Sequence, residues 1–228
     1  MYGFKLNHSL SSASLGLRLR APVDIPTSRR VVDDIEVTGR AGTLTRLLGW
    51  EDVRLHLPLA IRGGVHGYAR ASQALTEAVT ISLSIQPGVF RYVKYTQCSP
   101  LRRELASWGM FDVEITCEPF TYLDTGMGVE TLSSSGMVTN PGMLEAAPLI
   151  AVYGTGKLTL TINNTKHVIN SPADSVVIDS RLMTTHVAGK VQTDALTGPF
   201  PQLAPRANRV EFGPGISKIE VQGNWRNP

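Results

Sequence analysis

Apolar and polar residues alternate with a period of two through much of the chain. Residues 53–61 carry apolar side chains at every odd position, and residues 79–85, 111–117 and 158–162 show the same alternation. This pattern is typical of strands with one buried and one solvent-facing side, which occur in antiparallel sheets. The sequence therefore predicts a mainly β protein. Shorter candidate strands lie at 15–19, 31–37, 89–95, 176–178, 210–212 and 216–221.

Only one helix has a clear signal. Ala71, Ala74, Leu75, Ala78 and Val79 follow a helical spacing, which predicts a short amphipathic helix over residues 69–79. Residues 100–108 form a second candidate helix that is short enough to be, equally, a strand with a bend. Helix therefore adds little to the predicted β fold.

Pro58 lies inside the predicted strand 53–61. Because proline cannot donate a ladder hydrogen bond, it predicts that this strand lies at a sheet edge or contains a bulge. An exposed edge is a surface that a neighbouring subunit can cover.

The chain is predicted to form two domains. Residues 126–140 are small, polar and without a clear period, as in a linker or long loop. After them, turn signals at 153–156, 162–165, 170–172 and 212–215 recur at the spacing expected of a compact β-sandwich. We place the domains at 1–130 and 131–228.

Composition excludes several classes of protein. The 228 residues are 42% hydrophobic and 18% charged, with a formal net charge of +3, so neither disorder nor a strongly basic nucleic-acid surface is expected. The longest apolar run, residues 146–153, is short and contains Pro148, so we expect no membrane span and no membrane partner. Residues 1–12 show no apolar core of a secretory signal.

Motifs for chemistry are missing. The five histidines lack metal-ligand spacing, and Cys98 and Cys117 fit neither a zinc site nor a disulfide framework, but suit a reducing compartment. No nucleophile elbow is present, and Gly154-Thr-Gly156 precedes a strand pattern, so it favours a hairpin turn over a phosphate cradle. We expect no catalytic, cofactor or metal site, and no enzyme activity.

Several segments resemble, in order, the distal tail protein (Dit) family of phages with long non-contractile tails. In the first half these are residues 2–8 (YGFKLNH), 15–19 (LGLRL), 35–44 (IEVTGRAGTL) and 105–120 (LASWGMFDVEITCEPF). In the second half they are residues 140–142 (NPG), 148–154 (PLIAVYG), 177–180 (VIDS), 198–203 (GPFPQL) and 208–212 (NRVEF). The sequence departs from the family pattern at two positions. Ala41 stands where the family usually has Asp, and Arg206 stands where it has Gly, which puts the backbone geometry of the turn at Arg206 in question.

This resemblance implies a specific architecture and role. It implies an N-terminal, ring-forming β-sandwich with one helix, and a C-terminal galectin-like jelly-roll sandwich. Six copies would form a ring hub at the distal end of the tail. Its partners would be the tail tube protein, the tape-measure protein and a tail-associated fibre or lysin protein, with DNA passing through the ring without specific recognition. The protein would be made in the host bacterial cytoplasm and located in the virion.

The residues also suggest where copies meet, and leave an alternative open. A closed ring needs two different matching surfaces on each subunit. Pro58 and the glycine-rich loop over residues 62–68, which contains Gly63, Gly64 and His66, are our candidate interface residues. The alternative is a carbohydrate-binding adhesin module of the tail tip, for which the second half offers few aromatic residues (Tyr153, Phe200, Phe212 and Trp225).

Overall fold

The computed structural model describes residues 3–105 and 107–228, without the side chains of residues 103–105. Tyr2 and Ala106, which belong to two of the motifs above, lie outside the described residues. The chain divides into two compact units: unit 1 is Met1–Thr121 with Pro228, and unit 2 is Tyr122–Asn227. Every strand pair for which the register is described is antiparallel, as the alternation predicts.

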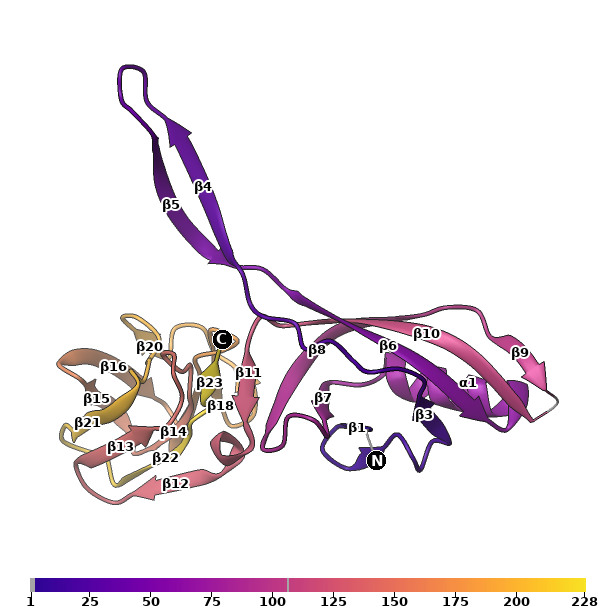
Figure 1. Ribbon diagram of the computed structural model, residues 1–228. Helices are drawn as coiled ribbons and strands as arrows, with labels where there is room; N and C mark the ends of the chain where they lie inside the picture. Colours follow the sequence, from indigo (N-terminus) through magenta and orange to yellow (C-terminus); the bar gives the residue numbers. More distant parts are fainter. Residues whose placement is uncertain (1–2, 106) are drawn as a thin grey trace. The chain divides into compact units, whose positions relative to one another are not determined.

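In unit 1 the described residues form ten strands that end before Thr121, and one helix (Figure 1). The elements are β1 (Phe4–Leu6), β2 (Leu10–Ser11), β3 (Leu17–Leu19), β4 (Arg30–Glu36), β5 (Thr43–Trp50), β6 (Val53–Arg62), α1 (Gly64–Thr76), β7 (Thr80–Leu83), β8 (Val89–Cys98), β9 (Arg102–Leu105) and β10 (Trp108–Cys117).

The sheet of unit 1 folds over a single hydrophobic core. Its strand order is β2-β1-β7-β8-β10-β6-β3, with β9 added to β10. β8 turns the sheet back on itself, because its first half pairs with β7 and its second half with β10. The alternating side chains of β6 and β10 meet in register, with Leu57 opposite Val113 and Leu55 opposite Ile115, all fully buried.

The helix begins earlier than the sequence predicts. It runs over Gly64–Thr76 and not 69–79, and its buried positions are Gly64, Gly67, Ala71 and Leu75. Two of these four are glycines, which a hydropathy pattern does not register. A Cβ atom at Gly67 would come 2.6 Å from the Arg62 carbonyl oxygen, so the close approach of helix and strand requires glycine there.

The candidate helix at 100–108 is wrong, and its strand alternative is right. Residues Arg102–Leu105 form β9, which pairs with β10 through an irregular register next to Trp108. Gly109 packs against Leu101, where a Cβ atom would come 2.6 Å from Cδ1 of that leucine. The Gly109 signal therefore marks close packing in a strand and not the end of a helix.

Unit 2 is built from short strands and one 3₁₀ turn. The elements are β11 (Thr121–Leu123), η1 (Asp124–Met127), β12 (Val129–Leu132), β13 (Gly136–Asn140), β14 (Leu149–Tyr153), β15 (Gly156–Ile162), β16 (Thr165–Ser171), β17 (Ser175–Asp179), β18 (Thr184–Val187), β19 (Lys190–Val191), β20 (Leu196–Thr197), β21 (Arg206–Phe212), β22 (Lys218–Gln222) and β23 (Arg226–Asn227).

Two antiparallel sheets form the predicted sandwich. One has the order β12-β22-β14-β17-β18-β19, and the other has the order β13-β21-β15-β16-β20. The chain passes repeatedly from one sheet to the other, and the buried side chains between them include Ile150, Ile178, Leu160 and Ile219. The mainly β prediction, with a jelly-roll β-sandwich in the second half, is confirmed.

Two local predictions in this half are wrong. Residues 126–140 are not a linker, because β12 and β13 lie within them and form an outer strand of each sheet. The turn at 153–156 is not a hairpin, since β14 and β15 belong to different sheets. The turn at 162–165 is a true hairpin, in which Asn163 and Asn164 have φ values of 47° and 69°.

Arg206 is held in the left-handed backbone region, with φ at 75°. Left-handed geometry costs a non-glycine residue about 1–2 kcal/mol. Glycine avoids this cost, but it loses more conformational entropy on folding, which offsets part of the gain in stability. We predict that Arg206→Gly raises the free energy of unfolding of unit 2 by about 0.5–1 kcal/mol, measured by urea denaturation. Arg206→Ala, which keeps the Cβ atom, is the control and should give no gain. A glycine variant less stable than the alanine variant would contradict the prediction.

His167 makes unit 2 sensitive to acid. The side chain is 2% exposed on β16, and Nδ1 lies 2.8 Å from the carbonyl oxygen of Pro199. Burial lowers the pKa of His167 below its usual value of 6.5. The unfolded chain therefore binds this proton more readily, and the stability contributed by the neutral imidazole is lost as pH falls below about 6.5. We predict that His167→Gln flattens the fall in stability between pH 7 and pH 5, measured by thermal denaturation. An unchanged slope would contradict it.

Candidate oligomer interface

A long two-stranded hairpin is the most unusual surface of the protein. It consists of β4, β5 and the turn between them, residues 30–50, which we call the arm (Figure 1). Among the described strands, β4 and β5 pair only with each other. A lone two-stranded hairpin is at best marginally stable in water, so the arm needs a further contact.

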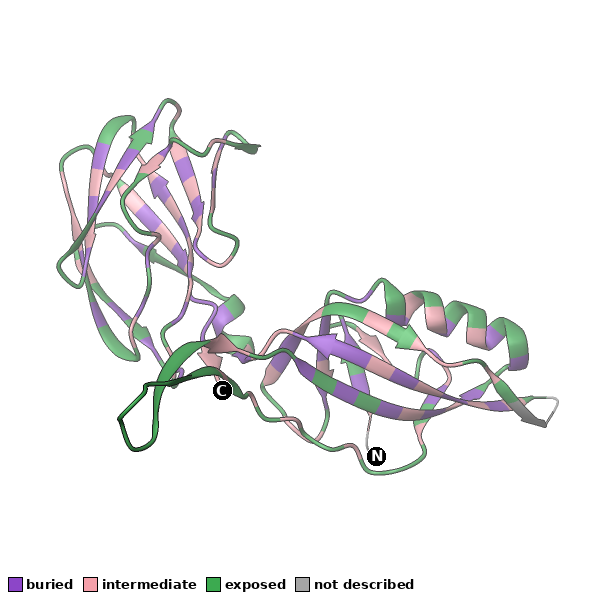
Figure 2. Cartoon of the chain, turned by 90° about the horizontal axis from the view of Figure 1, so that it is seen from above, coloured by how far each residue is buried: buried purple, intermediate pink, exposed green. Residues whose placement is uncertain are grey.

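The arm exposes apolar side chains that a water-facing hairpin would not carry. Both strands are exposed over nearly their whole length (Figure 2). Val32 is 50% exposed and Leu47 is 60% exposed, and Ile35, Leu44 and Leu48 are also exposed. Contiguous exposed apolar side chains indicate a surface that binds another molecule.

The base of the arm is fixed to unit 1. The rings of Trp50 and Phe120 meet edge to face with centroids 5.5 Å apart, and the Arg30 guanidinium lies 4.0 Å from the centroid of the Trp50 ring. The Ser28 hydroxyl donates a hydrogen bond to the carbonyl oxygen of Pro119. These contacts hold the root of the arm in place while leaving its length exposed.

Arg91 adds a buried clamp at the same place. Its side chain is 4% exposed and donates a 3.0 Å hydrogen bond to the carbonyl oxygen of Pro26. Burial lowers the pKa of Arg91, although such a guanidinium stays charged near neutral pH. A buried cation satisfied by backbone carbonyls ties the segment before β4 to the core strand β8.

The two faces of the arm differ in charge. Val32 faces Leu47, Asp34 faces Thr45 and Glu36 faces Thr43, so one face is apolar near the root and acidic toward the tip. On the other face Asp33 lies opposite Arg46, and Ile35 lies opposite Leu44. The hydroxyl of Thr45 donates a 2.6 Å hydrogen bond to Asp34.

Pro58 lies where β6 loses one of its two neighbours. The predicted edge therefore holds only over part of this strand, which lies between β10 and β3 and shows no bulge in its described pairings. β3 pairs with Leu59–Ile61 of β6, and the N–H of Arg20 donates a 2.9 Å hydrogen bond to the Pro58 carbonyl. In an antiparallel strand the N and O atoms of one residue point the same way, so the missing donor of Pro58 lies where pairing with β3 ends. Over residues 53–57, β6 pairs with β10 alone among the described strands.

Gly63, Gly64 and His66 lie together at the start of α1, but not in a loop. Gly63 has a φ of 102° and turns the chain from β6 into the helix, and Gly64 is buried with a φ of 60°. His66 is exposed in the first turn. The prediction of a glycine-rich loop over 62–68 is therefore wrong, while the proposed role of these residues in an interface stays a prediction.

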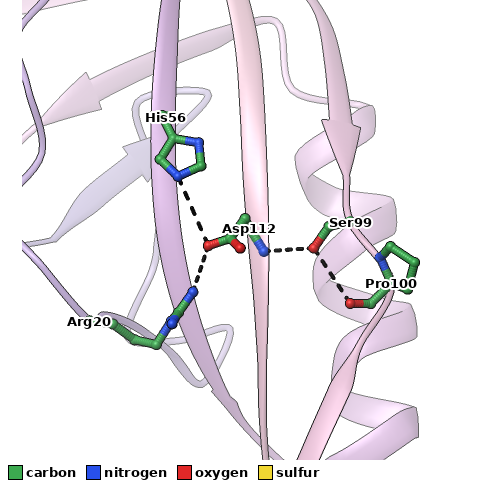
Figure 3. Close-up of polar contacts among 5 residues, drawn as sticks. All are labelled: Arg20, His56, Ser99, Pro100 and Asp112. Carbon is green, nitrogen blue, oxygen red and sulfur yellow. Dashed lines mark hydrogen bonds and ion pairs between the residues drawn. The ribbon is translucent and has the colours of Figure 1, made fainter.

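Charged side chains cover the outer face of β6 and β10. Asp112 accepts a hydrogen bond from Arg20 at 2.5 Å and has the His56 Nε2 atom 4.0 Å away (Figure 3). The backbone N–H of Asp112 also donates to the Ser99 hydroxyl at 2.8 Å. His56 thus occupies the outward position that the alternation predicts, and the group has the form of a surface ion-pair network.

Neither cysteine is a reactive thiol. Cys117 is fully buried on β10, and burial, partly offset by the nearby Arg91 cation, raises its pKa to about 12. Cys98 is half-buried, and burial raises its pKa as well. Burial therefore keeps Cys117 in the thiol form at pH 8, and the thiolate is the nucleophilic form.

We predict that iodoacetamide at pH 8 leaves Cys117 unmodified in the folded protein and labels Cys98 more slowly than a free thiol. Intact-mass spectrometry should show at most one added group before denaturation and two after it. Rapid double labelling of the native protein would contradict the burial of Cys117.

The aromatic side chains of unit 2 do not form an open platform for a sugar. Trp225 is buried, and Phe200 and Phe212 pack against the core of the sandwich. The Lys218 ammonium lies 4.1 Å from the centroid of the Tyr153 ring, and Glu220 accepts hydrogen bonds from both side chains. Tyr153 is thus engaged with Lys218 and Glu220, and the hydrogen bond from Lys218 lowers the pKa of Glu220.

Among the described residues, no group of three or more His, Cys, Asp and Glu side chains could hold a metal ion. No helix in the described part of the chain has the length and apolar character needed to cross a membrane.

The fold is that of phage tail-hub and baseplate proteins. No protein-family model matches the sequence, and no curated protein sequence matches it. Solved structures do match, over nearly the whole chain. The expected resemblance to distal tail proteins is confirmed at the level of the fold.

The SPP1 Dit (gp 19.1) protein, described as a paradigm of the hub adsorption apparatus in phages that infect Gram-positive bacteria, matches with a TM-score of 0.64. The identity is 12%, and the match covers 97% of this chain and 98% of that one. A chain of the phage P2 baseplate in its activated conformation with Ca matches with a TM-score of 0.56 at 7% identity, over 100% of this chain and 98% of that one. The same baseplate with Sr gives 0.53 at 8%, over 97% of each chain.

Proposed function

We propose that this chain is a structural virion protein that forms a ring hub of six copies at the distal end of a phage tail. The observation that carries the proposal is the arm: a rooted hairpin with exposed apolar side chains and unpaired edges, on a fold shared with hub and baseplate proteins. Such an arm gains stability only when a second molecule covers it.

Unit 1 supplies what a ring subunit needs. A closed ring is made from two different surfaces that match on successive copies. The arm is one candidate surface, and the open edge of β6 beside Pro58 is another. Gly63, Gly64 and His66, at the turn into α1, complete the proposed interface residues. We assign ring formation to unit 1, the predicted N-terminal domain, and contacts with the tail tip to the sandwich of unit 2.

The partners follow from the place of a hub in a tail. We propose that the ring joins the tail tube protein and the end of the tape-measure protein to a tail-associated fibre or lysin protein. DNA passes through without specific recognition. The protein is made in the host bacterial cytoplasm, ends in the virion and has no catalytic role. The burial of Trp225 and the packing of Phe200 and Phe212 against the core of unit 2 support a structural role over sugar binding.

The test compares two exposed apolar residues in different units. Leu47 on the arm is 60% exposed and Val129 on β12 is 62% exposed. We predict that the wild-type chain forms rings in negative-stain images, that Leu47→Asp shifts it to monomers in light scattering, and that Val129→Asp leaves the rings intact. Circular dichroism confirms folding of both variants.

The proposal has a clear contradicting outcome. It fails if the wild-type chain stays monomeric at every concentration, alone and when mixed with the tail tube protein of the same phage. Equal loss of rings with Leu47→Asp and Val129→Asp would show that the arm has no special role.

A further inference from the structure

A basic patch lies at one end of the outer face of the unit 1 sheet. Register places Arg18, Ala60, Met110 and Arg102 in one row across β3, β6, β10 and β9. Directly opposite residues of paired strands share a face, so both arginines point to the same side as Met110. The adjoining outward pair is Arg62 and Trp108.

Arg18, Arg62 and Arg102 are exposed, and none of them forms an ion pair with a carboxylate among the residues whose side chains the structure describes. By contrast, Arg20 and Arg54 on the same face pair with Asp112 and Glu114. The Arg18 guanidinium lies 5.8 Å from the centroid of the half-buried Trp108 ring, which gives the patch an apolar centre.

One face of the arm is acidic where the patch is basic, and we call the face that carries Asp34 and Glu36 the acidic face. It carries Val32 and Leu47 near the root and Asp34 and Glu36 toward the tip, and between Val32 and Glu36 its facing residues include no cation. Seven residues of β4 span about 23 Å at strand geometry, which is long enough to reach an adjacent subunit.

We propose that, within the ring of the proposed function on which this inference rests, the acidic face of the arm docks on the basic patch of the next copy. Val32 and Leu47 lie against Trp108 and Met110, and Asp34 and Glu36 pair with Arg18, Arg62 and Arg102. The two surfaces are different and lie on the same unit, which is the requirement of a head-to-tail interface that closes into a ring. Apolar contacts supply affinity, and the charge pairs fix register and exclude wrong partners.

The experiment reverses the charge of one surface at a time in the full chain. The arm variant is Asp34→Arg with Glu36→Arg, and the patch variant is Arg18→Glu with Arg62→Glu. We expect each variant alone to need at least about tenfold higher concentration for half-assembly than wild type, measured by light scattering.

The decisive sample is the equal mixture of the two variants. A reversed arm then meets a reversed patch, and a wild-type arm meets a wild-type patch, so the mixture should form rings in which the variants alternate. Asp33→Arg, on the same strand but on the opposite face of the arm, is the matched control and should assemble as wild type does. Circular dichroism and melting temperature establish that each variant is folded.

Each other outcome overturns the inference. If wild type forms rings and both single-surface variants do so equally well, the surfaces are not in contact and the hub proposal still stands. If wild type assembles but the mixture does not, the arm and patch do not pair with each other. A wild-type chain that never assembles removes the proposed ring itself.

Discussion

The arm carries apolar side chains that it cannot bury by itself. Two antiparallel strands bury little, and every apolar side chain on them stays exposed unless another surface covers it. The root of the arm is nevertheless held in place, because Trp50 packs against Phe120 and the buried Arg91 donates a hydrogen bond to Pro26. A rigid root with an unburied length is the design expected when the covering surface lies on a different molecule, because the arm is then already oriented before it binds.

Much of the fold could be predicted from the sequence, for a simple physical reason. A strand with one buried side must alternate, and the sequence does so over residues 53–61 of β6 and residues 111–117 of β10. The same rule located β15, and the Asn163-Asn164 turn located the hairpin that follows it. Where burial is one-sided and local, hydropathy records it directly.

The rest could not be predicted because it depends on residues that hydropathy does not register. The first turn of α1 is buried through Gly64 and Gly67, which have no side chains to reveal a buried face. β12 and β13 are outer strands, so few of their residues are buried and their sequence reads as a polar linker. β5 mixes apolar and polar residues on both faces, with Leu47 beside Thr45 on one and Leu44 beside Arg46 on the other, which hides the alternation of a strand and conceals the arm. The missing donor of Pro58 predicted a sheet edge, and β6 has one only over residues 53–57, because β3 pairs with the rest of the strand.

The low identity to structures of the same fold follows from how this fold is specified. At 12% identity and a TM-score of 0.64, what the chains share is the arrangement of strands, not particular side chains. One-sided burial fixes that arrangement, and many apolar residues satisfy it equally. Surface charges are under no such constraint from the fold, so Asp34 and Glu36 on the arm and Arg18 and Arg62 on the sheet are free to differ between chains of this fold. In the proposed ring, matched charges would let copies of this chain select one another over related subunits, since a like charge across an interface costs more than a missing pair.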